Sequence, residues 1–394
     1  MIDQQPETNQ DAIAPLTPEP LSPAEIGNLC VGDPPIPLDV APEKSATAPP
    51  SAVARRPGPG FFESIAWMIG LFAVQLGGIA LAVSLIFVNA LLTGEIDPRR
   101  SGPAELVNKL MALFRNDFLA ILGASQLATI IYGLLAIQFR IRPRGVRRLG
   151  LQLPSLDHSL LVALLMPPMW LLSSALMNVL VQWMPWAEAS LKESIDVMVQ
   201  FPLWLLMLVV GLQPAVAEEL VFRGLIGRGL IARWGLVPGM LATSILFGVM
   251  HMHPVQGLAV IPLGFAMHYA YYTTRSIWAP MTLHSLNNLL SVVLLKYRAG
   301  SPGDALAETD SDVPIPLLIV SLAMVLAISI WLWKTRVQYV LQDGSVWNPG
   351  YTTTEAPRRE DNAVATRHSM SPLLLAITTI VAVGVVAAAW QLAT

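Results

Sequence analysis

The sequence predicts an all-α protein, a polytopic bundle of about nine transmembrane helices preceded by a disordered tail rich in Pro and Ala. Of its 394 residues, 54% are hydrophobic and only 13% are charged, and the mean hydropathy is strongly positive. Soluble globular chains carry nearer a quarter charged residues. Apolar runs of about 20 residues, which as helices span a bilayer, recur along the chain. Together these observations favour an integral membrane protein.

Charge and cysteine content exclude several other classes of protein. The formal net charge of −3 is too small to indicate a nucleic-acid partner. The single cysteine, Cys30, leaves no pair for an intrachain disulfide and no set of thiolates for a zinc cage. No cleavable signal peptide is visible, because the first apolar segment follows about sixty polar and Pro-rich residues.

Composition divides the chain into four parts. Residues 1–60 are rich in Pro, Ala and acidic side chains, and such a segment buries too little apolar surface to offset its ordering entropy, so we expect a disordered cytoplasmic tail. Residues 61–200 should hold the N-terminal transmembrane helices, residues 201–298 a core with most of the intramembrane polar side chains, and residues 299–394 the C-terminal helices with a polar connector.

The expected spans are defined by the apolar runs. In order they cover about residues 65–92, 118–139, 160–183, 201–231, 236–252, 255–272, 278–295, 315–333 and 373–390. The third span contains Pro167-Pro168 and should kink there. The stretch 106–114 could lie flat at the membrane interface.

Charges in the connectors predict the orientation of the bundle. The second span is followed by a cluster of arginines: Arg140, Arg142, Arg144, Arg147 and Arg148. By the positive-inside rule this loop is cytoplasmic. Alternating sides from there places the N-terminus and residues 334–367 inside and the acidic loop 302–312 outside. The Ala/Pro-rich style and the lack of organelle signals favour a bacterial inner membrane.

The fourth span carries charged side chains where it should still be crossing the bilayer. Keeping one ionised side chain at the bilayer centre costs at least about 2.5–3.5 kcal/mol, so such a cluster serves pairing, function or both. Glu219 and Arg223 are four residues apart and can pair on one helical face. Glu218 is turned about 100° away and needs partners from other helices. The candidates are His251, His284 and Asn288.

Helical spacing predicts that these candidates can approach Glu218. Glu218 and His251 are each 16 residues from the turn at 234–235, which joins two antiparallel spans. Both therefore lie about 24 Å from that turn. His284 and Asn288 are four residues apart on one face of the seventh span. Counted from a turn at Ser276, Asn288 should lie nearer than His284 to the level of Glu218.

This set of side chains suits amide hydrolysis, which needs a base to activate water and an acid for the leaving amine. A glutamate and a nearby imidazole can share the water, while a second imidazole and a carboxamide can donate hydrogen bonds to a tetrahedral oxyanion. Glu219 and Arg223 would then support the site. Phe247 shares the face of His251 and could provide an apolar surface beside the carboxylate.

Other interpretations stay open. The charged cluster could be a structural ion pair or a proton relay in a non-catalytic membrane scaffold or transport component. An isolated intramembrane histidine is often only an interhelical hydrogen-bonding group, so the candidates count as a set. His268 is a spare candidate for the site, and His253 should mark the external end of the fifth span. Gly257 and Gly264 indicate close helix packing.

Three motifs in order resemble those of the CPBP intramembrane proteases, the group that contains the CAAX prenyl endopeptidases and the bacteriocin-processing or immunity-type proteins. They are Glu218-Glu219-x-x-x-Arg223, Phe247-x-x-x-His251 and His284-x-x-x-Asn288. The stretch 274–280 is also similar, and the resemblance covers roughly residues 203–295. It implies an endopeptidase with its catalytic core at 201–298. Glu218 and His251 would activate water, and His284 and Asn288 would stabilise the oxyanion.

The resemblance leaves the cofactor open. A glutamate-based mechanism requires none, although members of the family were long described as metalloproteases. The sequence lacks His-Glu-x-x-His. Zinc held by Glu218, His251 and His284 is the alternative, because three N/O ligands leave a position for water.

The resemblance also implies a peptide or protein substrate, which could be membrane-anchored; the prenylated substrates of eukaryotic members are not carried over. Arg223, Arg228 and Arg233 lie five residues apart along the fourth span. Such side chains are kept out of lipid. We therefore expect a water-filled, positively charged vestibule that opens to the cytoplasm and admits the substrate.

Overall fold

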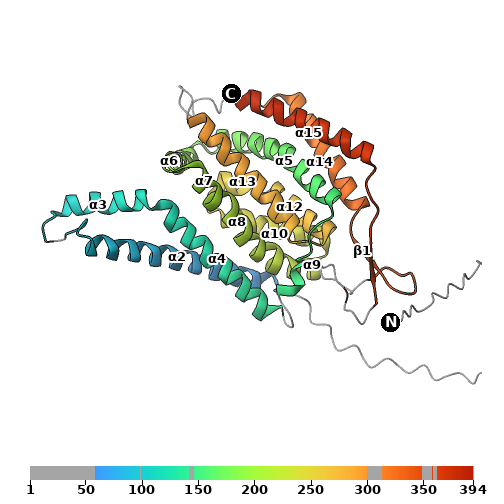
Figure 1. Ribbon diagram of the computed structural model, residues 1–394, viewed down its shortest axis with the longest axis horizontal. Coiled ribbons are helices and arrows are strands. Elements are labelled where there is room, and N and C mark those ends of the chain that lie inside the picture. The colour runs from blue at the N-terminus through green and yellow to red at the C-terminus, as the bar shows by residue number, and fades with distance from the viewer. Residues whose placement is uncertain are drawn as a thin grey trace, which may run out of the picture. The chain divides into compact units, whose positions relative to one another are not determined.

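The computed structural model describes residues 58–97, 99–141, 146–299, 313–347, 357 and 362–393 (Figure 1). The expected disorder of residues 1–57, the acidic loop 302–312, and Arg142 and Arg144 of the basic loop lie outside the described residues. Within the described residues the chain is almost entirely helical, which confirms the predicted all-α class.

The helices follow one another along the chain, and a long connector, residues 335–371, separates the last two. Their bounds are α2 (Phe61–Leu92), α3 (Pro103–Asn116), α4 (Phe118–Arg140), α5 (Leu156–Trp183), α6 (Glu188–Met198), α7 (Leu203–Leu206), α8 (Gln213–Val221), α9 (Gly227–Trp234), α10 (Leu236–Met250), α11 (Pro254–Ala259), α12 (Ile261–Thr274), α13 (Trp278–Ala299), α14 (Ile315–Lys334) and α15 (Pro372–Ala393). Two π-helical turns, η3 (Met207–Leu212) and η4 (Phe222–Ile226), join α7, α8 and α9 into one continuous helix. Short 3-10 turns are η1 (Val146–Leu149) and η2 (Pro185–Ala187).

Five helices of the described chain are long and apolar enough to cross a membrane. They are Phe61–Leu92, Phe118–Arg140, Leu156–Trp183, Leu203–Trp234 and Ile315–Lys334, which correspond to the first four predicted spans and the eighth. Two shorter apolar helices, Leu236–Met250 and Pro372–Val385, fall at the fifth and ninth. The chain is therefore an integral membrane protein by helix length and composition, and the count of nine spans stays a prediction.

The prediction of one sixth span over 255–272 is wrong. This region forms two helices, α11 and α12, which meet near Val260. Proline stands in the first turn of each helix. A proline favours a helix start, because its missing N–H needs no intrahelical partner there. Neither helix alone reaches the roughly 20 residues of a full span.

The amphipathic stretch predicted at 106–114 lies in α3. The large apolar side chains at positions 107, 110, 111 and 114 are all exposed. Their spacing places them on one helical face. That this face lies on the membrane interface stays a prediction.

A small antiparallel sheet was not foreseen in the polar connector that follows α14. Strands β1 (Gln338–Val340) and β2 (Val364–Thr366) pair with Tyr339 opposite Ala365. Arg275, at the end of α12, reaches this sheet, since its Nε donates to the Val337 carbonyl at 3.1 Å and its guanidinium lies 5.4 Å from the centre of the Tyr339 ring.

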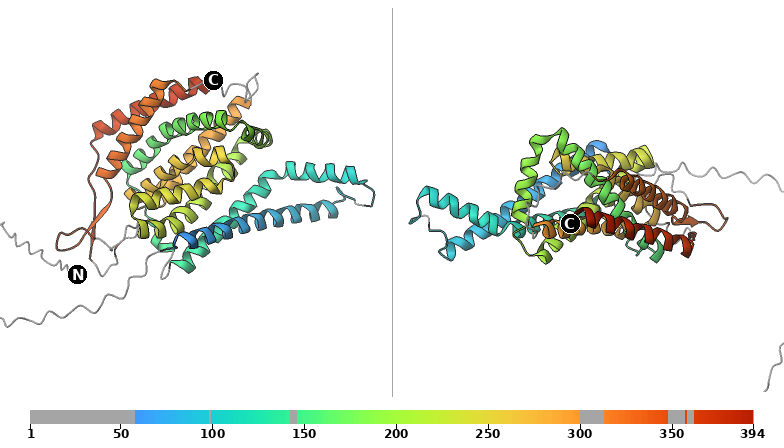
Figure 2. Two further views of the ribbon diagram at one scale, coloured as in Figure 1. Left: turned by 180° about the vertical axis from the view of Figure 1, so that it is seen from behind. Right: turned by 90° about the horizontal axis from the view of Figure 1, so that it is seen from above.

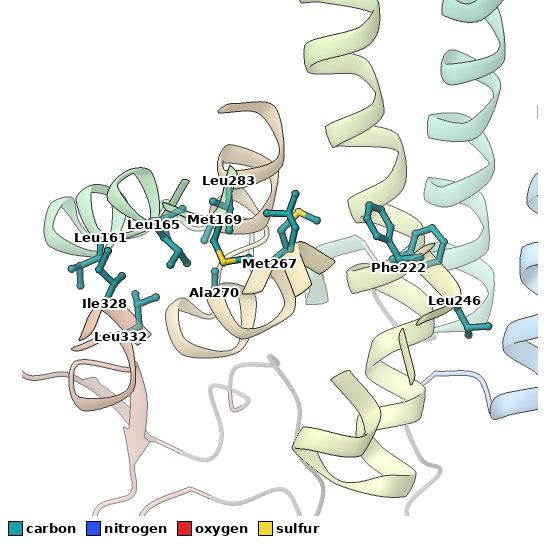
Figure 3. Packing of buried hydrophobic residues seen from close by; sticks show 14 of the residues in the cluster. Leu161, Leu165, Met169, Phe222, Leu246, Met267, Ala270, Leu283, Ile328 and Leu332 are labelled. Carbon is teal, nitrogen blue, oxygen red and sulfur yellow. The ribbon is translucent and has the colours of Figure 1, made fainter. Parts of the chain in front are cut away.

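The apolar core joins helices that are far apart in the sequence. α14 and α15 pack along α5, and α2 packs along α4, which in turn packs on α8 (Figure 2). Leu161 of α5 lies close to Ile328 and Leu332 of α14, while Met267 of α12 lies in the middle of the same cluster (Figure 3). The core therefore fixes α12 and α13 against the long helix Leu203–Trp234.

Close helix packing at the predicted glycines is confirmed. A Cβ added at Gly257 would lie 2.6 Å from the Gly248 carbonyl oxygen, so α10 and α11 approach each other through their backbones. A Cβ at Gly264 would lie 3.2 Å from the Phe247 ring. These glycines bring α11 and α12 against the end of α10, where the polar candidates begin.

Candidate active site

The helix that carries the acidic motif is locally distorted on both sides of it. α8 holds Glu218 and Glu219 and lies between the π-helical turns η3 and η4. Pro214, near the start of α8, has no N–H to donate to the Val210 carbonyl four residues earlier. π-helical turns are rare and occur frequently at functional sites.

Glu219 and Arg223 form the ion pair that their spacing predicts. Arg223 Nη1 lies 2.7 Å from Glu219 Oε1, and both side chains are fully buried. Arg223 Nη2 also donates to the Gly264 carbonyl of α12 at 2.7 Å. The guanidinium carbon lies 4.8 Å from the centre of the Phe247 ring. Arg223 thus ties the acidic helix to both α10 and α12.

His284 lies between the two adjacent carboxylates. Its Nδ1 is 2.9 Å from Glu219 Oε1, and its Nε2 is 4.0 Å from Glu218 Oε2. Glu218 Oε2 is buried and has no hydrogen-bond partner within the described residues. The bond between Glu219 and His284 was missed from the sequence, which offers no signal that two adjacent carboxylates share one imidazole.

The hydrogen bond to Glu219 restricts what His284 can donate. A carboxylate only accepts, so the imidazole proton lies on Nδ1. Neutral His284 then presents Nε2 as an acceptor, and it can donate from Nε2 only as an imidazolium. With both carboxylates ionised, Arg223 and a protonated His284 together would balance their charge.

His251 ends α10 with its imidazole turned back on the helix. Its Nδ1 lies 3.0 Å from the Phe247 carbonyl oxygen, an acceptor, so Nε2 stays available. α10 ends at Met250, two residues before the predicted end, because Met252 adopts a positive φ of 50°. The Phe247 ring lies edge-on to both imidazoles, with centroids 5.0 Å from His251 and 5.8 Å from His284. Phe247 therefore links His251 to the carboxylate cluster.

Asn288 lies farther from Glu218 than predicted. Its Nδ2 donates to the Val210 carbonyl at 3.2 Å, eight residues before Glu218, whereas His284 lies beside both carboxylates. The estimate counted depth from Ser276 as if that turn lay at the membrane surface. Ser276 is fully buried under the connector to α5, where Ile277 N donates to the Gly150 carbonyl at 2.9 Å. The order of depth was therefore wrong.

The two other histidines singled out from the sequence, His253 and His268, have separate surroundings. His268 is buried against Gly227, whose position leaves no room for a Cβ beside the imidazole. Within the described residues no hydrogen bond connects His268 to the acidic motif. His253 Nε2 lies 3.0 Å from the Ala187 carbonyl oxygen, and its Nδ1 accepts from Gln256 N at the start of α11. His253 thus caps a helix end, as its predicted position suggests.

The expectation of a positively charged, water-filled vestibule beside the arginines is wrong for the described residues. Arg223 and Arg228 are buried. Arg228 Nη1 donates to the Arg148 carbonyl at 2.6 Å, and Arg233 Nη1 donates to the Pro59 carbonyl at 2.8 Å. Leu225, between them, is fully buried as well. The arginines satisfy carboxylate and backbone oxygens where segments of the chain meet.

Among the described residues, no group of three or more His, Cys, Asp or Glu side chains is placed to hold a metal ion. Zinc at Glu218, His251 and His284 stays the alternative to a metal-free mechanism. His284 does share one feature with metal-binding histidines: its Nδ1 is hydrogen-bonded to a carboxylate, that of Glu219, while Nε2 makes no such bond within the described part of the chain.

Comparisons with known proteins agree with the motifs. Residues 200–290 match the family described as Type II CAAX prenyl endopeptidase Rce1-like. A protein of Bacillus subtilis (strain 168) named "Putative membrane peptidase YdiL" is 27% identical over 100 residues, which are 25% of this chain and 40% of that protein. The chain thus matches less than half the length of this curated relative. No solved structure matches the chain.

The matched segment contains all three motifs, at 218–223, 247–251 and 284–288. The comparisons confirm the resemblance predicted from them: this segment is similar to the CPBP intramembrane proteases. It is also the part of the chain in which α8 and α13 bring His284 beside both carboxylates.

Proposed function

We propose that the protein is an intramembrane endopeptidase that hydrolyses a peptide bond in or next to the membrane, with Glu218 as the general base. The observation that carries this proposal is the buried Oε2 of Glu218, which has no hydrogen-bond partner within the described residues and lies 4.0 Å from Nε2 of His284. An unpaired carboxylate oxygen inside a membrane bundle is costly, and the neighbouring polar groups come from other helices.

Each polar group has a role in this proposal. Glu218, with His251, takes a proton from water as the water attacks the carbonyl, and returns it to the leaving amine. His284 as imidazolium and Asn288 donate hydrogen bonds to the oxyanion. Glu219 holds His284 through Nδ1, and Arg223 offsets the charge of Glu219. The substrate is a peptide or protein, membrane-anchored or free, and the proposed location is a bacterial inner membrane with the N-terminus in the cytoplasm.

Replacing His251 by alanine tests the proposal. Purified protein in lipid vesicles is incubated with a library of free, membrane-anchored and prenylated peptides, and products are identified by mass spectrometry. Because His251 shares the activation of water, we expect its loss to lower the cleavage rate by about 10²–10⁴-fold.

The matched control is His253→Ala, which removes a histidine that caps the start of α11 and contacts the Ala187 carbonyl, away from the carboxylates, and should keep most of the parent rate. If parent and His251→Ala protein yield the same products equally fast, the assignment fails. If no bond is cleaved by any preparation, a scaffold or transport role is favoured instead.

The absence of a metal requirement is a second expected result. Because the proposed mechanism activates water with Glu218, cleavage should survive prolonged chelation. Metal content measured on the same sample should be well below one zinc per chain. Loss of activity on chelation that zinc alone restores would instead support the alternative in which Glu218, His251 and His284 hold the ion.

A further inference from the structure

We propose that Pro214 and Asn287 are positioning residues that fix the carboxamide of Asn288 in the orientation needed for oxyanion binding. This inference rests on the proposed function and adds two residues to it. Asn288 Nδ2 donates to the Val210 carbonyl at 3.2 Å, and Asn287 Nδ2 donates to Asn288 Oδ1 at 3.3 Å. Both ends of the Asn288 carboxamide are therefore engaged.

The Val210 carbonyl is available because of the sequence around it. In an α-helix it would accept a hydrogen bond from the residue four positions later, which is Pro214 and has no N–H. Val210 also lies within the π-helical turn η3, where the helical bonding is already altered. Pro214 offers the Val210 carbonyl no N–H, and this partly buried oxygen accepts from Asn288 Nδ2 of α13.

The two contacts admit one orientation of the carboxamide. A carbonyl oxygen only accepts, so the NH₂ end of Asn288 must face Val210. The reversed amide would set Oδ1 against the Val210 oxygen and Nδ2 against the NH₂ group of Asn287. In the observed orientation one N–H of Nδ2 is used on Val210, and the other remains to donate to a developing oxyanion.

The substitution Pro214→Ala tests this arrangement, because it supplies the missing N–H to Val210 and removes a proline from within a helix. We expect the thermal stability to stay equal or rise while kcat falls about tenfold, with KM unchanged, since Asn288 loses a hydrogen bond that orients it. Asn287→Ala should lower kcat by a similar factor. Ser291→Ala, one turn farther along α13, is the matched control and should keep the parent kcat.

Pro214→Ala could lower kcat by misplacing Asn288 or by moving Glu218 on the same helix. Repeating the substitution in Asn288→Ala protein separates these two causes. In Asn288→Ala protein there is no carboxamide to orient, so adding Pro214→Ala should change kcat no further. A full further tenfold loss in that background would overturn the inference, because Pro214 would then act on some other group.

Side-chain NMR gives a readout that does not depend on catalysis. In protein labelled with ¹⁵N-asparagine, we expect Pro214→Ala and Asn287→Ala to shift the Asn288 carboxamide signals and to speed their exchange with solvent. Unchanged signals in both variants would overturn the inference. The variants could shift these signals although the parent protein cleaves no peptide. That result would support the orientation of Asn288 and refute the proposed function.

Discussion

Replacing Arg223 by methionine is expected to destabilise the protein by about 3–5 kcal/mol, the usual cost of removing one partner from a buried ion pair. Both side chains of the pair with Glu219 are fully buried. Without the guanidinium, Glu219 keeps only its bond to His284, and the Gly264 carbonyl loses a donor. Unfolding by denaturant in detergent micelles, followed by helical circular dichroism, measures the change.

The double variant Arg223→Met, Glu219→Gln is the control for this prediction. Because it removes both charges, it should recover a large part of the stability that the single variant loses. A single variant as stable as the parent would show that the guanidinium is not needed to compensate Glu219.

Replacing Glu218 by glutamine should have the opposite pattern, with catalysis lost and stability kept. Glu218 Oε2 makes no hydrogen bond within the described residues, so a carboxamide of the same shape breaks no hydrogen bond there and gives up only the 4.0 Å ion contact with His284 Nε2. A carboxamide cannot take a proton from water, and we expect the cleavage rate to fall by about 10³-fold or more.

Cleavage rates and unfolding curves of the same preparation should be compared for Glu218→Gln. Lost activity with an unchanged unfolding midpoint supports the role of general base. Cleavage at the parent rate would remove Glu218 from the mechanism, while loss of activity together with loss of stability would point to a structural role.

Local spacing and composition predicted much of this arrangement. Apolar runs located the membrane helices, because burial in lipid demands long apolar segments with internal backbone hydrogen bonds. The spacing of Glu219 and Arg223 predicted their ion pair, since helical geometry alone brings such residues together. His253 was predicted to mark the end of the fifth span, and it does lie between two helices, where it caps the start of α11.

Features that depend on tertiary packing could not be predicted in the same way. The contact of His284 with both carboxylates depends on how far Ser276 is buried, which residue counting from an assumed surface cannot give. The burial of Arg228 likewise depends on a backbone carbonyl from a distant connector. The division between α11 and α12 did have a local signal, the prolines in their first turns, which the long apolar run obscured.

The two π-helical turns have a consequence for how this chain is compared with relatives. A π-helical turn accommodates one residue more than the α-helix around it, so each can arise from a one-residue insertion. One residue corresponds to about 100° of rotation. Without the extra residue in η3, the side chains of α8 would turn away from the helices they now face. Single-residue gaps at 207–212 and 222–226 are therefore to be expected in accurate alignments with relatives that lack these turns. An ungapped alignment would pair the wrong faces of this helix.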